Sequence, residues 1–379
     1  MTNNNTPAWL QEMLPFAKTA WKQSQFSQPT TIQNESIPYV LKGRDVIAEA
    51  PTGSGKTLAY LLPMLQSIDT KKKHTQVLIL ASSHELVMQI HQEVQTWSKD
   101  SGVQSATLIG GANVKRQIEK LKKKPQLVIG TPGRVYELMQ KKKLKAHEIK
   151  TIVLDEADQL LVPEHIKMVQ NIIKSTLKER QILLYSATLP EEVEKTASEF
   201  MKSPEIVRVK EEAQKPEVEH LYIPCEDREK VEVLRKLAHT DHFKGLAFMR
   251  DIGNLNVYAE KLRFKGIELE VLHSDAKKEQ RAKALRGYRN GEYNLLLATD
   301  VAARGIDIPD ITCIVNFDVP KDFSAYVHRA GRTARVGSSS GVVISLVNPV
   351  EEKRLKKIAR DHDFHLKKGE VIKGKLRYR

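Results

Sequence analysis

Short, almost continuously apolar runs recur along this chain and constrain its fold more than any other feature. In the first half these runs are residues 45–48, 77–80, 127–130, 152–154 and 182–185. The stretches between them, such as 85–99 and 164–177, space their apolar residues at helical intervals. Runs that do not alternate with polar residues are typical of strands covered on both faces. The pattern therefore predicts an α/β domain built on a parallel sheet.

The same alternation restarts after residues 209–219, a highly charged stretch that contains proline. The apolar runs of the second half are residues 245–248, 267–271, 295–298, 314–317 and 342–346. Because 379 residues exceed what one hydrophobic core usually organises, we predict two tandem α/β domains. We place the N-terminal domain at 1–208, a linker at 209–219 and the C-terminal domain at 220–379. The last residues, 366–379, form a short basic tail that we expect to be a flexible extension.

The chain has an excess of basic residues, which favours a negatively charged partner. Lysine and arginine together number 61 against 47 acidic residues, which gives a net charge of +14. Such an excess suits a polyanionic partner such as nucleic acid, although many basic proteins bind nothing specific. Three lysine runs, 71–73, 122–124 and 141–143, are predicted to be solvated charges between elements, with direct phosphate contact as the alternative.

The N-terminal sequence, the longest apolar stretch and the two cysteines are typical of a cytoplasmic protein. The first residues have neither the basic region nor the apolar core of a secretory signal, and the most apolar stretch, 58–68, is too short to span a bilayer. We therefore expect no membrane partner. Cys225 and Cys313 lack the spacing of a zinc or redox site, so we expect two buried free thiols.

A phosphate-binding loop is predicted at Gly53-Ser54-Gly55-Lys56-Thr57, which follows a predicted strand and precedes an apolar helical stretch. Glycines let backbone N–H groups turn around phosphate oxygens, and the helix N-terminus adds a favourable dipole. Lys56 is expected to bridge the β and γ phosphates, and the Thr57 hydroxyl to bind Mg²⁺. Together with Thr52, these residues are the candidates for binding a nucleoside triphosphate.

Paired carboxylates follow another predicted strand, in Asp155-Glu156-Ala157-Asp158. Ligands bind at the carboxyl ends of strands in open α/β sheets. Asp155 is the natural Mg²⁺ partner, and Glu156 is the group that orients or deprotonates the attacking water. Thr131-Pro132-Gly133-Arg134 also follows a predicted strand. Its exposed amides and Arg134 could hold a phosphate backbone, with a plain Pro-Gly turn as the alternative.

The second half carries a further signature, His328-Arg329-Ala330-Gly331-Arg332-Thr333-Ala334-Arg335. Planar guanidinium groups suit the charge that spreads over a transferring γ-phosphate. A triphosphate loop in one half and an arginine-rich segment in the other therefore predict a hydrolytic site that is completed only when two domains meet.

The order of these segments resembles the DEAD-box family of ATP-dependent RNA helicases, in its minimal bacterial form, over nearly the whole chain. The resemblance implies two RecA-like domains. Residues 24–33 match the family's adenine-reading segment, which implies that Gln33 reads the adenine edge and Phe26 stacks on the ring. Trp9 lies about where the family has a further aromatic residue, and a packing role is the equal alternative.

The resemblance also implies roles for other residues. In the segment 298–307, Thr299 would contact RNA and Asp307 the nucleotide ribose, while Arg332 and Arg335 match the family's two arginine fingers. RNA contacts are implied for His84, Gly111, Thr131, Pro132, Gly133 and Arg134, and coupling between the domains for Asp158, Ser186, Thr188 and His328.

Two departures from the family pattern are visible. Ser82-Ser83-His84-Glu85-Leu86-Val87 stands where the family has Pro-Thr-Arg-Glu-Leu-Ala. An always-charged guanidinium thus gives way to an imidazole whose charge depends on pH, which puts the grip on the RNA backbone in question. Ser274 stands where the family usually has glycine.

The resemblance implies an enzyme that hydrolyses ATP with Mg²⁺ when bound to RNA, and that opens duplexes locally. The RNA would be structured or duplex and held mainly by its backbone. We expect a monomer, and the resemblance permits a role in ribosome assembly or in RNA turnover. An ATP-gated RNA clamp or assembly scaffold is the alternative from another functional class. A DNA helicase is a third possibility, which the adenine-reading segment and the acidic tetrapeptide argue against by resemblance.

Overall fold

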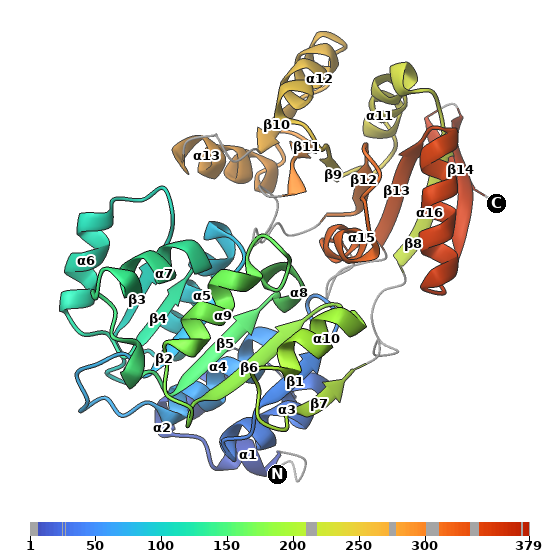
Figure 1. Cartoon of the computed structure of the whole chain (residues 1–379). Coiled ribbons are helices and arrows are strands. Elements are labelled where there is room, and N and C mark those ends of the chain that lie inside the picture. The colour runs from blue at the N-terminus through green and yellow to red at the C-terminus, as the bar shows by residue number, and fades with distance from the viewer. Residues whose placement is uncertain are drawn as a thin grey trace. The chain divides into compact units, whose positions relative to one another are not determined.

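The computed structural model describes residues 7–24, 26, 28–209, 218–272, 278–300, 311–333, 341–372 and 374–378. The chain divides into two compact units, Met1–Glu211 and Glu212–Arg379, each built around its own sheet (Figure 1). Most of the predicted linker 209–219 lies outside the described residues. Its last two residues, Val218 and Glu219, begin the first strand of the second unit.

The first unit contains a seven-stranded parallel sheet in the order β3-β4-β2-β5-β6-β1-β7. Its strands are β1 (Val46–Glu49), β2 (Val77–Ala81), β3 (Ser105–Leu108), β4 (Leu127–Gly130), β5 (Thr151–Asp155), β6 (Gln181–Ser186) and β7 (Glu205–Arg208). Its helices are α1 (Ala8–Gln11), α2 (Pro15–Gln23), α3 (Thr31–Leu41), α4 (Lys56–Ser67), α5 (His84–Trp97), α6 (Val114–Lys122), α7 (Pro132–Gln140), α8 (Ala157–Leu160), α9 (Ile166–Lys174) and α10 (Glu191–Ser198), with a short 3₁₀ turn, η1 (Ala146–Glu148).

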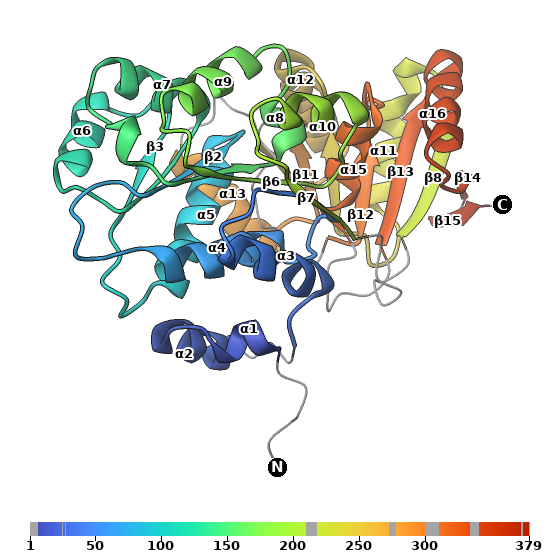
Figure 2. The ribbon, with the colours of Figure 1, turned by 60° about the horizontal axis from the view of Figure 1, so that its bottom comes forward.

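Helices cover both faces of this sheet, which explains why its central strands are apolar throughout. Helices α1–α5 pack against one face and α6–α10 against the other; Figure 2 shows α3 and α4 on one side of the strands and α7 and α9 on the opposite side. Successive residues of a strand point to opposite faces. Accordingly Val77 and Ile79 of β2 join one core, whereas Leu78 and Leu80 join the other.

The second unit contains an eight-stranded sheet in the order β10-β11-β9-β12-β13-β8-β14-β15. Its strands are β8 (Val218–Pro224), β9 (Gly245–Phe248), β10 (Leu269–Leu272), β11 (Leu295–Ala298), β12 (Cys313–Asn316), β13 (Gly341–Val347), β14 (Leu366–Ile372) and β15 (Lys375–Tyr378). Its described helices are α11 (Lys230–Ala238), α12 (Ile252–Phe264), α13 (Lys278–Arg289), α15 (Phe323–Ala330) and α16 (Pro349–Asp361), with the 3₁₀ turn η2 (Asp227–Glu229). The strands are parallel except β15, which runs antiparallel to β14.

These two sheets confirm the predicted fold class. The apolar runs found from sequence became β1, β2, β4, β5, β6 and β9 to β13; β8, β14 and β15 were not predicted, nor were β3 and β7. Both are edge strands of the first sheet, and β7 carries Glu205 and Arg208. An edge strand has a neighbour on one side only and keeps more polar residues, so its sequence signal is weaker.

The prediction that residues 366–379 form a flexible extension was wrong. Residues 366–368 of β14 pair with β8, and the rest of β14 pairs with β15. Gly369 is buried, and the Lys367 Nζ donates a hydrogen bond to Glu219 Oε1 at 2.8 Å. The many lysines suggested a solvated tail, but Val371 of β14 and Leu376 of β15 pack against the core of the second unit.

The expectation of two buried thiols holds for only one cysteine. Both cysteines are free, but Cys313 is buried at the start of β12, while Cys225 is half-buried. Burial raises the pKa of the Cys313 thiol to about 12 and that of Cys225 to about 11, so both thiols stay protonated at neutral pH.

Candidate functional site

The predicted residues of the first unit converge on one edge of its sheet. The phosphate loop follows β1, Ser82 follows β2, Thr131 follows β4, Asp155 ends β5 and Ser186 ends β6. The strands are parallel, so all these positions lie at the carboxyl edge of the sheet, where open α/β folds bind ligands. Sequence order alone could not show which of these strands are neighbours.

The phosphate loop turns into helix α4 through glycines with a left-handed backbone, Gly53 at φ 78° and Gly55 at φ 88°. Lys56, the first residue of α4, donates hydrogen bonds from Nζ to the carbonyls of Ala50, at 2.5 Å, and Pro51, at 2.8 Å. The buried Ser54 hydroxyl makes no hydrogen bond with any described residue. A buried polar atom without a partner, at a helix N-terminus, fits a loop that binds an anion.

Gln33 of helix α3 lies directly against this loop. Its amide donates to the Gly55 carbonyl at 3.2 Å, and its Oε1 accepts from the Thr30 backbone at 3.0 Å. The φ angle of Gly55 favours glycine, and a Cβ at this position would lie only 2.6 Å from Gln33 Nε2 and push that amide away. The predicted adenine-reading residue and the phosphate loop are thus held together, with Gln33 only 3% exposed.

Phe26, the predicted adenine-stacking residue, is 51% exposed. Its ring lies on a cluster of tryptophans, stacked on Trp97 at 6.3 Å and edge-on to Trp21 at 5.7 Å. Trp9 packs edge-on against Trp21 in the same cluster and donates from Nε1 to Asn34. The structure therefore gives Trp9 a packing role, while Phe26 presents an aromatic surface to solvent.

Asp155 is buried at the end of β5, and its carboxylate is held by a tyrosine that the sequence analysis missed. Tyr60 of α4 donates from its hydroxyl to Asp155 Oδ2 at 2.8 Å. Burial, followed by the nearby Glu156 carboxylate, raises the pKa of Asp155 to about 6, while Tyr60 and Lys56 oppose the shift. Thr57 stands one helical turn before Tyr60, so Tyr60 links the two predicted Mg²⁺ ligands.

Glu156 follows in a left-handed conformation, φ 53°, which turns the chain sharply after β5. Its carboxylate accepts a hydrogen bond from the Ser82 hydroxyl at 2.7 Å. Ser82 immediately follows β2, the strand beside β5. Ser82 belongs to the segment that departs from the family pattern. It orients the carboxylate of Glu156, which is predicted to activate the attacking water, and the sequence did not reveal this role.

Three of the residues predicted to couple the domains form one buried network. The Asp158 carboxylate accepts from the Ser186 hydroxyl at 2.7 Å and from the Thr188 hydroxyl at 3.0 Å. All three side chains are buried. The network joins the turn after β5 to the turn after β6 through buried hydrogen bonds.

The predicted RNA residues of the first unit meet around the loop 110–113. His84 begins α5, and its ring lies against Gly110 and Gly111, where added Cβ atoms would be 3.3 and 3.9 Å away. Arg134, only 8% exposed, donates from Nη1 to the Ala112 carbonyl at 3.1 Å and pairs with Glu137 at 2.9 Å. In this structure Arg134 therefore supports the loop that carries Gly111.

Helix α7 offers its N-terminus beside that loop. Thr131 is its N-cap, Pro132 is buried as its first residue, and Gly133 is exposed. Proline at the first helical position leaves the remaining N-terminal amides available, and such amides bind phosphate readily.

In the second unit an arginine that was given no role of its own organises the end of β11. Arg329 of α15 pairs with both oxygens of Asp300, at 2.6 and 2.7 Å, and donates to the Asn316 side chain at 2.9 Å. Its guanidinium also lies 4.9 Å from the centre of the Phe248 ring. Asp300 directly follows Thr299, the predicted RNA contact, which is buried. Arg329 thus fixes the segment that carries Thr299.

Two further predicted residues, His328 and Arg332, lie at the C-terminal end of helix α15. His328 is in α15, and Arg332 follows it, 7% exposed, with its backbone N–H bonded to the Arg329 carbonyl. The predicted contacts Asp307 and Arg335, and the departure at Ser274, lie outside the described residues.

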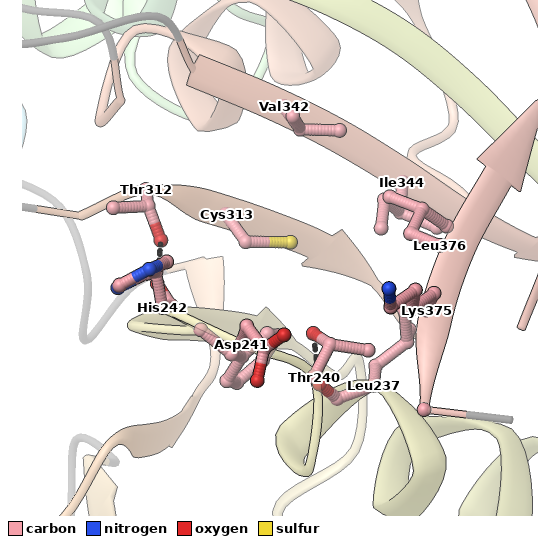
Figure 3. A pocket seen from close by; sticks show the side chains of 12 residues that line it. Leu237, Thr240, Asp241, His242, Thr312, Cys313, Val342, Ile344, Lys375 and Leu376 are labelled. Carbon is pink, nitrogen blue, oxygen red and sulfur yellow. Dashed lines mark hydrogen bonds between the residues drawn. The ribbon is translucent and has the colours of Figure 1, made fainter.

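A cavity of about 420 Å³ in the second unit lies at the opposite end of the strands from Thr299 (Figure 3). It opens at the amino ends of β12 and β13, between the end of α11 and β15, and is lined by Thr240, Asp241, His242, Thr312 and Cys313 among others. Thr312, which precedes β12, donates to the His242 carbonyl at 3.2 Å. The predicted RNA contact Thr299 instead follows the carboxyl end of β11.

The described residues form neither a cluster of metal ligands nor a helix that could cross a membrane. Within the part of the chain that the structure describes, no three His, Cys, Asp or Glu side chains cluster as metal ligands. A carboxylate and a hydroxyl, as Asp155 and Thr57 provide, nevertheless fit Mg²⁺, which usually takes one or two protein oxygens and completes its shell with phosphate and water. None of the described helices has the length and hydropathy that crossing a bilayer requires.

Comparisons with known proteins agree with this arrangement. Residues 30–196 match the DEAD/DEAH box helicase family, and residues 229–337 match the helicase conserved C-terminal domain. The probable ATP-dependent RNA helicase YfmL of Bacillus subtilis is 49% identical over 375 residues, 98% of this chain and 99% of that protein. The DEAD-box ATP-dependent RNA helicase CshC of Bacillus cereus is 46% identical over 365 residues, 96% of this chain and 94% of that protein.

A solved structure extends the likeness to both units. S. cerevisiae Dbp5 bound to RNA and ADP BeF3 matches with a TM-score of 0.85 at 29% identity, over 94% of each chain. The resemblance inferred from the motifs is confirmed. With both family domains matched in order, and with two relatives aligned over nearly their full lengths, the chain belongs to the DEAD-box family of ATP-dependent RNA helicases.

Proposed function

We propose that this helicase hydrolyses ATP when RNA is bound and uses the closure of its two domains to separate short duplexes. The observation that carries the proposal is the convergence at one sheet edge of the phosphate loop, the acid pair and the Asp158–Ser186–Thr188 network. In such a site, nucleotide binding at Asp155 can alter this hydrogen-bond network and thereby the end of the neighbouring strand β6. Boundaries at 1–208 and 220–379 place one domain on each side of the linker.

In the nucleotide site, Gln33 and Phe26 select adenine, and the loop 52–57 binds the phosphates. Thr57 and Asp155 would hold Mg²⁺, which would neutralise charge on the phosphate oxygens. Glu156, oriented by Ser82, positions the attacking water and takes its proton. Arg332 and Arg335 stabilise the negative charge of the transferring phosphoryl group, and Asp307 binds the ribose. Arginine contacts of this kind contribute about 10³–10⁵ in rate in phosphoryl transfer.

RNA is bound at the same sheet edge, around the loop 110–113 and the N-terminus of α7, and by Thr299 in the second domain. These groups reach the sugar–phosphate backbone, so binding is largely independent of sequence. The RNA in the Dbp5 structure supports this assignment by similarity. ATP and RNA each favour the closed state and therefore favour each other, because such coupling is reciprocal.

The biological setting that we propose is a cytoplasmic monomer acting on structured RNA in ribosome assembly or RNA turnover. The relatives' names specify an RNA helicase and no further target. The alternative is a clamp that binds RNA in an ATP-dependent manner without separating strands.

A strand-displacement assay with a short RNA duplex separates these two functions. We expect ATP-dependent release of one strand, and ATPase activity that rises when RNA is added. Hydrolysis stimulated by RNA without strand release would favour the clamp, and stimulation by DNA equal to that by RNA would contradict the choice of RNA.

Glu156→Gln provides the matched variant. It keeps the shape of the side chain but loses the base, so we expect ATP and RNA binding to persist while turnover falls by about 10²-fold or more. Lys56→Ala should instead lose ATP binding. Near-normal ATPase activity in Glu156→Gln would remove Glu156 from its proposed role.

A further inference from the structure

The three lysine runs of the first domain are brought together by the fold. Lys71–Lys73 precede β2, Lys122–Lys124 precede β4 and Lys141–Lys143 precede β5. These strands are immediate neighbours in the order β4-β2-β5, as Figure 1 also shows. All three runs therefore lie at the amino edge of the sheet, opposite the edge that carries the nucleotide site.

Hydrogen bonds join the loops that carry these runs. Gln126 donates from its amide to the carbonyls of Thr70, at 3.3 Å, and Lys72, at 3.2 Å. Thr75 donates from its hydroxyl to the Pro125 carbonyl at 3.0 Å, and the Lys150 backbone donates to the Gln76 carbonyl at 2.8 Å. The runs are thus held at fixed positions relative to one another, rather than on independent loops.

We call the three segments 69–76, 119–126 and 137–151 the lysine edge. They contain twelve lysines, no arginine and four carboxylates. Three of the lysines pair with a carboxylate of their own segment: Lys72 with Asp69, Lys122 with Glu119 and Lys141 with Glu137. The other nine amino groups have no carboxylate within 4.0 Å in the parts of the chain that the structure describes. The lysine edge is therefore strongly positive and largely uncompensated.

Two of these lysines occupy backbone positions that favour glycine. Lys124 follows the end of α6 with φ 55°, and Lys142 follows the end of α7 with φ 54°. The left-handed conformation at a helix C-terminus is unfavourable for a residue with a Cβ, and glycine is the usual occupant. Both helices thus end on a lysine where glycine would be less strained, which suggests that the charge itself is useful.

The chemistry of the lysine edge indicates which polyanion it fits. Exposed large hydrophobic side chains occur elsewhere in the described chain, at Leu14, Met88 and Leu177 for example, but not in these three segments. That argues against membrane insertion and against an apolar protein interface. Lysine binds phosphate as a point charge, and phosphate contacts carry no sequence information. Three neighbouring strands span about 10 Å, enough to face several phosphates of a duplex.

We propose that the lysine edge is a second RNA-binding surface, which binds the phosphate backbone of structured RNA outside the strand held at the carboxyl edge. The proposal rests on RNA being the substrate of the nucleotide-dependent site. Because the two edges of the sheet are opposite, an RNA must extend beyond the primary site to reach the lysine edge. The surface therefore increases affinity for large, folded RNAs and leaves hydrolysis itself unchanged.

The test compares two RNAs and two triple variants of the full chain. The probes are a single strand of about 10 nucleotides and the same strand joined to a hairpin of about 25 base pairs. The test variant carries Lys73→Gln, Lys123→Gln and Lys143→Gln. The control removes the same charge from exposed lysines elsewhere, with Lys22→Gln, Lys353→Gln and Lys357→Gln.

For the test variant we expect affinity for the hairpin RNA to fall about 5–20-fold near 0.1 M salt, with a salt slope shallower by about 2–3. Affinity for the short strand, and kcat of the RNA-stimulated ATPase, should stay as in the unchanged protein. The control variant should bind both RNAs normally. Loss of hairpin affinity in the control to the same extent would reduce the effect to net charge and overturn the proposal.

A second variant, Lys124→Gly with Lys142→Gly, guards against misfolding as an explanation. It removes two charges while relieving the left-handed lysines, so we expect weaker hairpin binding at an unchanged or higher melting temperature. If hairpin affinity stays normal in both lysine variants, the lysine edge does not bind RNA, and an acidic protein becomes the better candidate. If the unchanged protein shows no RNA-stimulated ATPase activity, the proposed function fails instead.

Discussion

Tyr60 and Tyr185 are two buried tyrosines near the acid pair, with ring centres 5.3 Å apart, yet they contact different groups. Tyr60 donates to Asp155, whereas Tyr185 donates to the Ser36 hydroxyl at 3.0 Å. This difference makes them a matched pair for testing whether the hydrogen bond to Asp155 matters for metal binding.

We predict that Tyr60→Phe raises the Mg²⁺ concentration needed for half-maximal ATPase activity by about 3–10-fold, the effect of losing one hydrogen bond that contributes about 1 kcal/mol. The hydroxyl favours ionised Asp155, so its removal raises the pKa of Asp155 further and weakens cation binding. Mg²⁺ titrations of ATPase activity at constant ATP measure this.

Tyr185→Phe is the control for that prediction. It removes a buried hydroxyl from the same core, so a comparable loss of stability is expected, about 1 kcal/mol. Its Mg²⁺ requirement should not change. Equal Mg²⁺ shifts in both variants would show that core packing, and not the contact with Asp155, sets the metal affinity.

At the scale of elements, Arg329 ties α15 to the ends of β11 and β12 through Asp300 and Asn316. A lysine cannot reproduce a planar, bidentate contact. We therefore predict that Arg329→Lys destabilises the second domain by about 1–3 kcal/mol, because the lysine keeps the charge but loses the paired hydrogen bonds to the partly exposed Asp300. Thermal or urea unfolding of the full chain measures the loss.

A double-mutant cycle with Asp300→Asn tests the pairing itself. If the two side chains act mainly on each other, the double variant should be far less destabilised than the sum of the single variants. Additive losses would mean that Arg329 acts through Asn316 and Phe248 instead.

Strand β8 contains a histidine whose burial makes the second domain sensitive to acid. His220 shares a hydrogen bond with the Tyr326 hydroxyl at 2.8 Å and contacts the Phe364 ring. Burial lowers the pKa of His220 to about 4, from 6.5 in an exposed chain. Between these values the unfolded chain takes up a proton that the folded protein excludes, so stability falls as pH falls from about 6.5 to about 4.

We predict that His220→Phe flattens this part of the stability–pH curve, because its ring keeps the packing but cannot be protonated. The slope attributable to His220 is at most about 1.4 kcal/mol per pH unit. Urea unfolding at several pH values measures it. Tyr326→Phe is the control, since it loses the hydrogen bond yet keeps the histidine, and its acid sensitivity should remain.

At the scale of the whole molecule, each domain has its own sheet and its own cores, so each is expected to fold alone. Residues 1–208 keep the phosphate loop and the acid pair but lack Arg332 and Arg335. We predict that this fragment binds ATP and shows no RNA-stimulated hydrolysis. A steady-state ATPase assay with and without RNA measures this, with the full chain as reference. RNA-stimulated turnover by the fragment equal to that of the full chain would contradict a site shared between the domains.

Much of the fold could be predicted because the strands are short apolar runs with helices on both faces. The runs at 77–80, 127–130 and 295–298 coincide closely with β2, β4 and β11. Prediction failed at the edge strands β3 and β7, at the interior strand β8 and at the β14–β15 pair. At the edges the sequence is polar, and only pairing with a neighbouring strand stabilises the extended chain.

The sequence by itself determined the family and the candidate chemistry, because loops such as Gly53–Thr57 and Asp155–Asp158 require particular residues in immediate succession. Only the tertiary structure decided which distant side chains support them: Tyr60 on Asp155, Ser82 on Glu156 and Arg329 on Asp300. It also decided that the three lysine runs share one edge, because strand order in a sheet differs from order in the chain. Contacts between residues far apart in sequence depend on that strand order, and local sequence patterns carry no record of it.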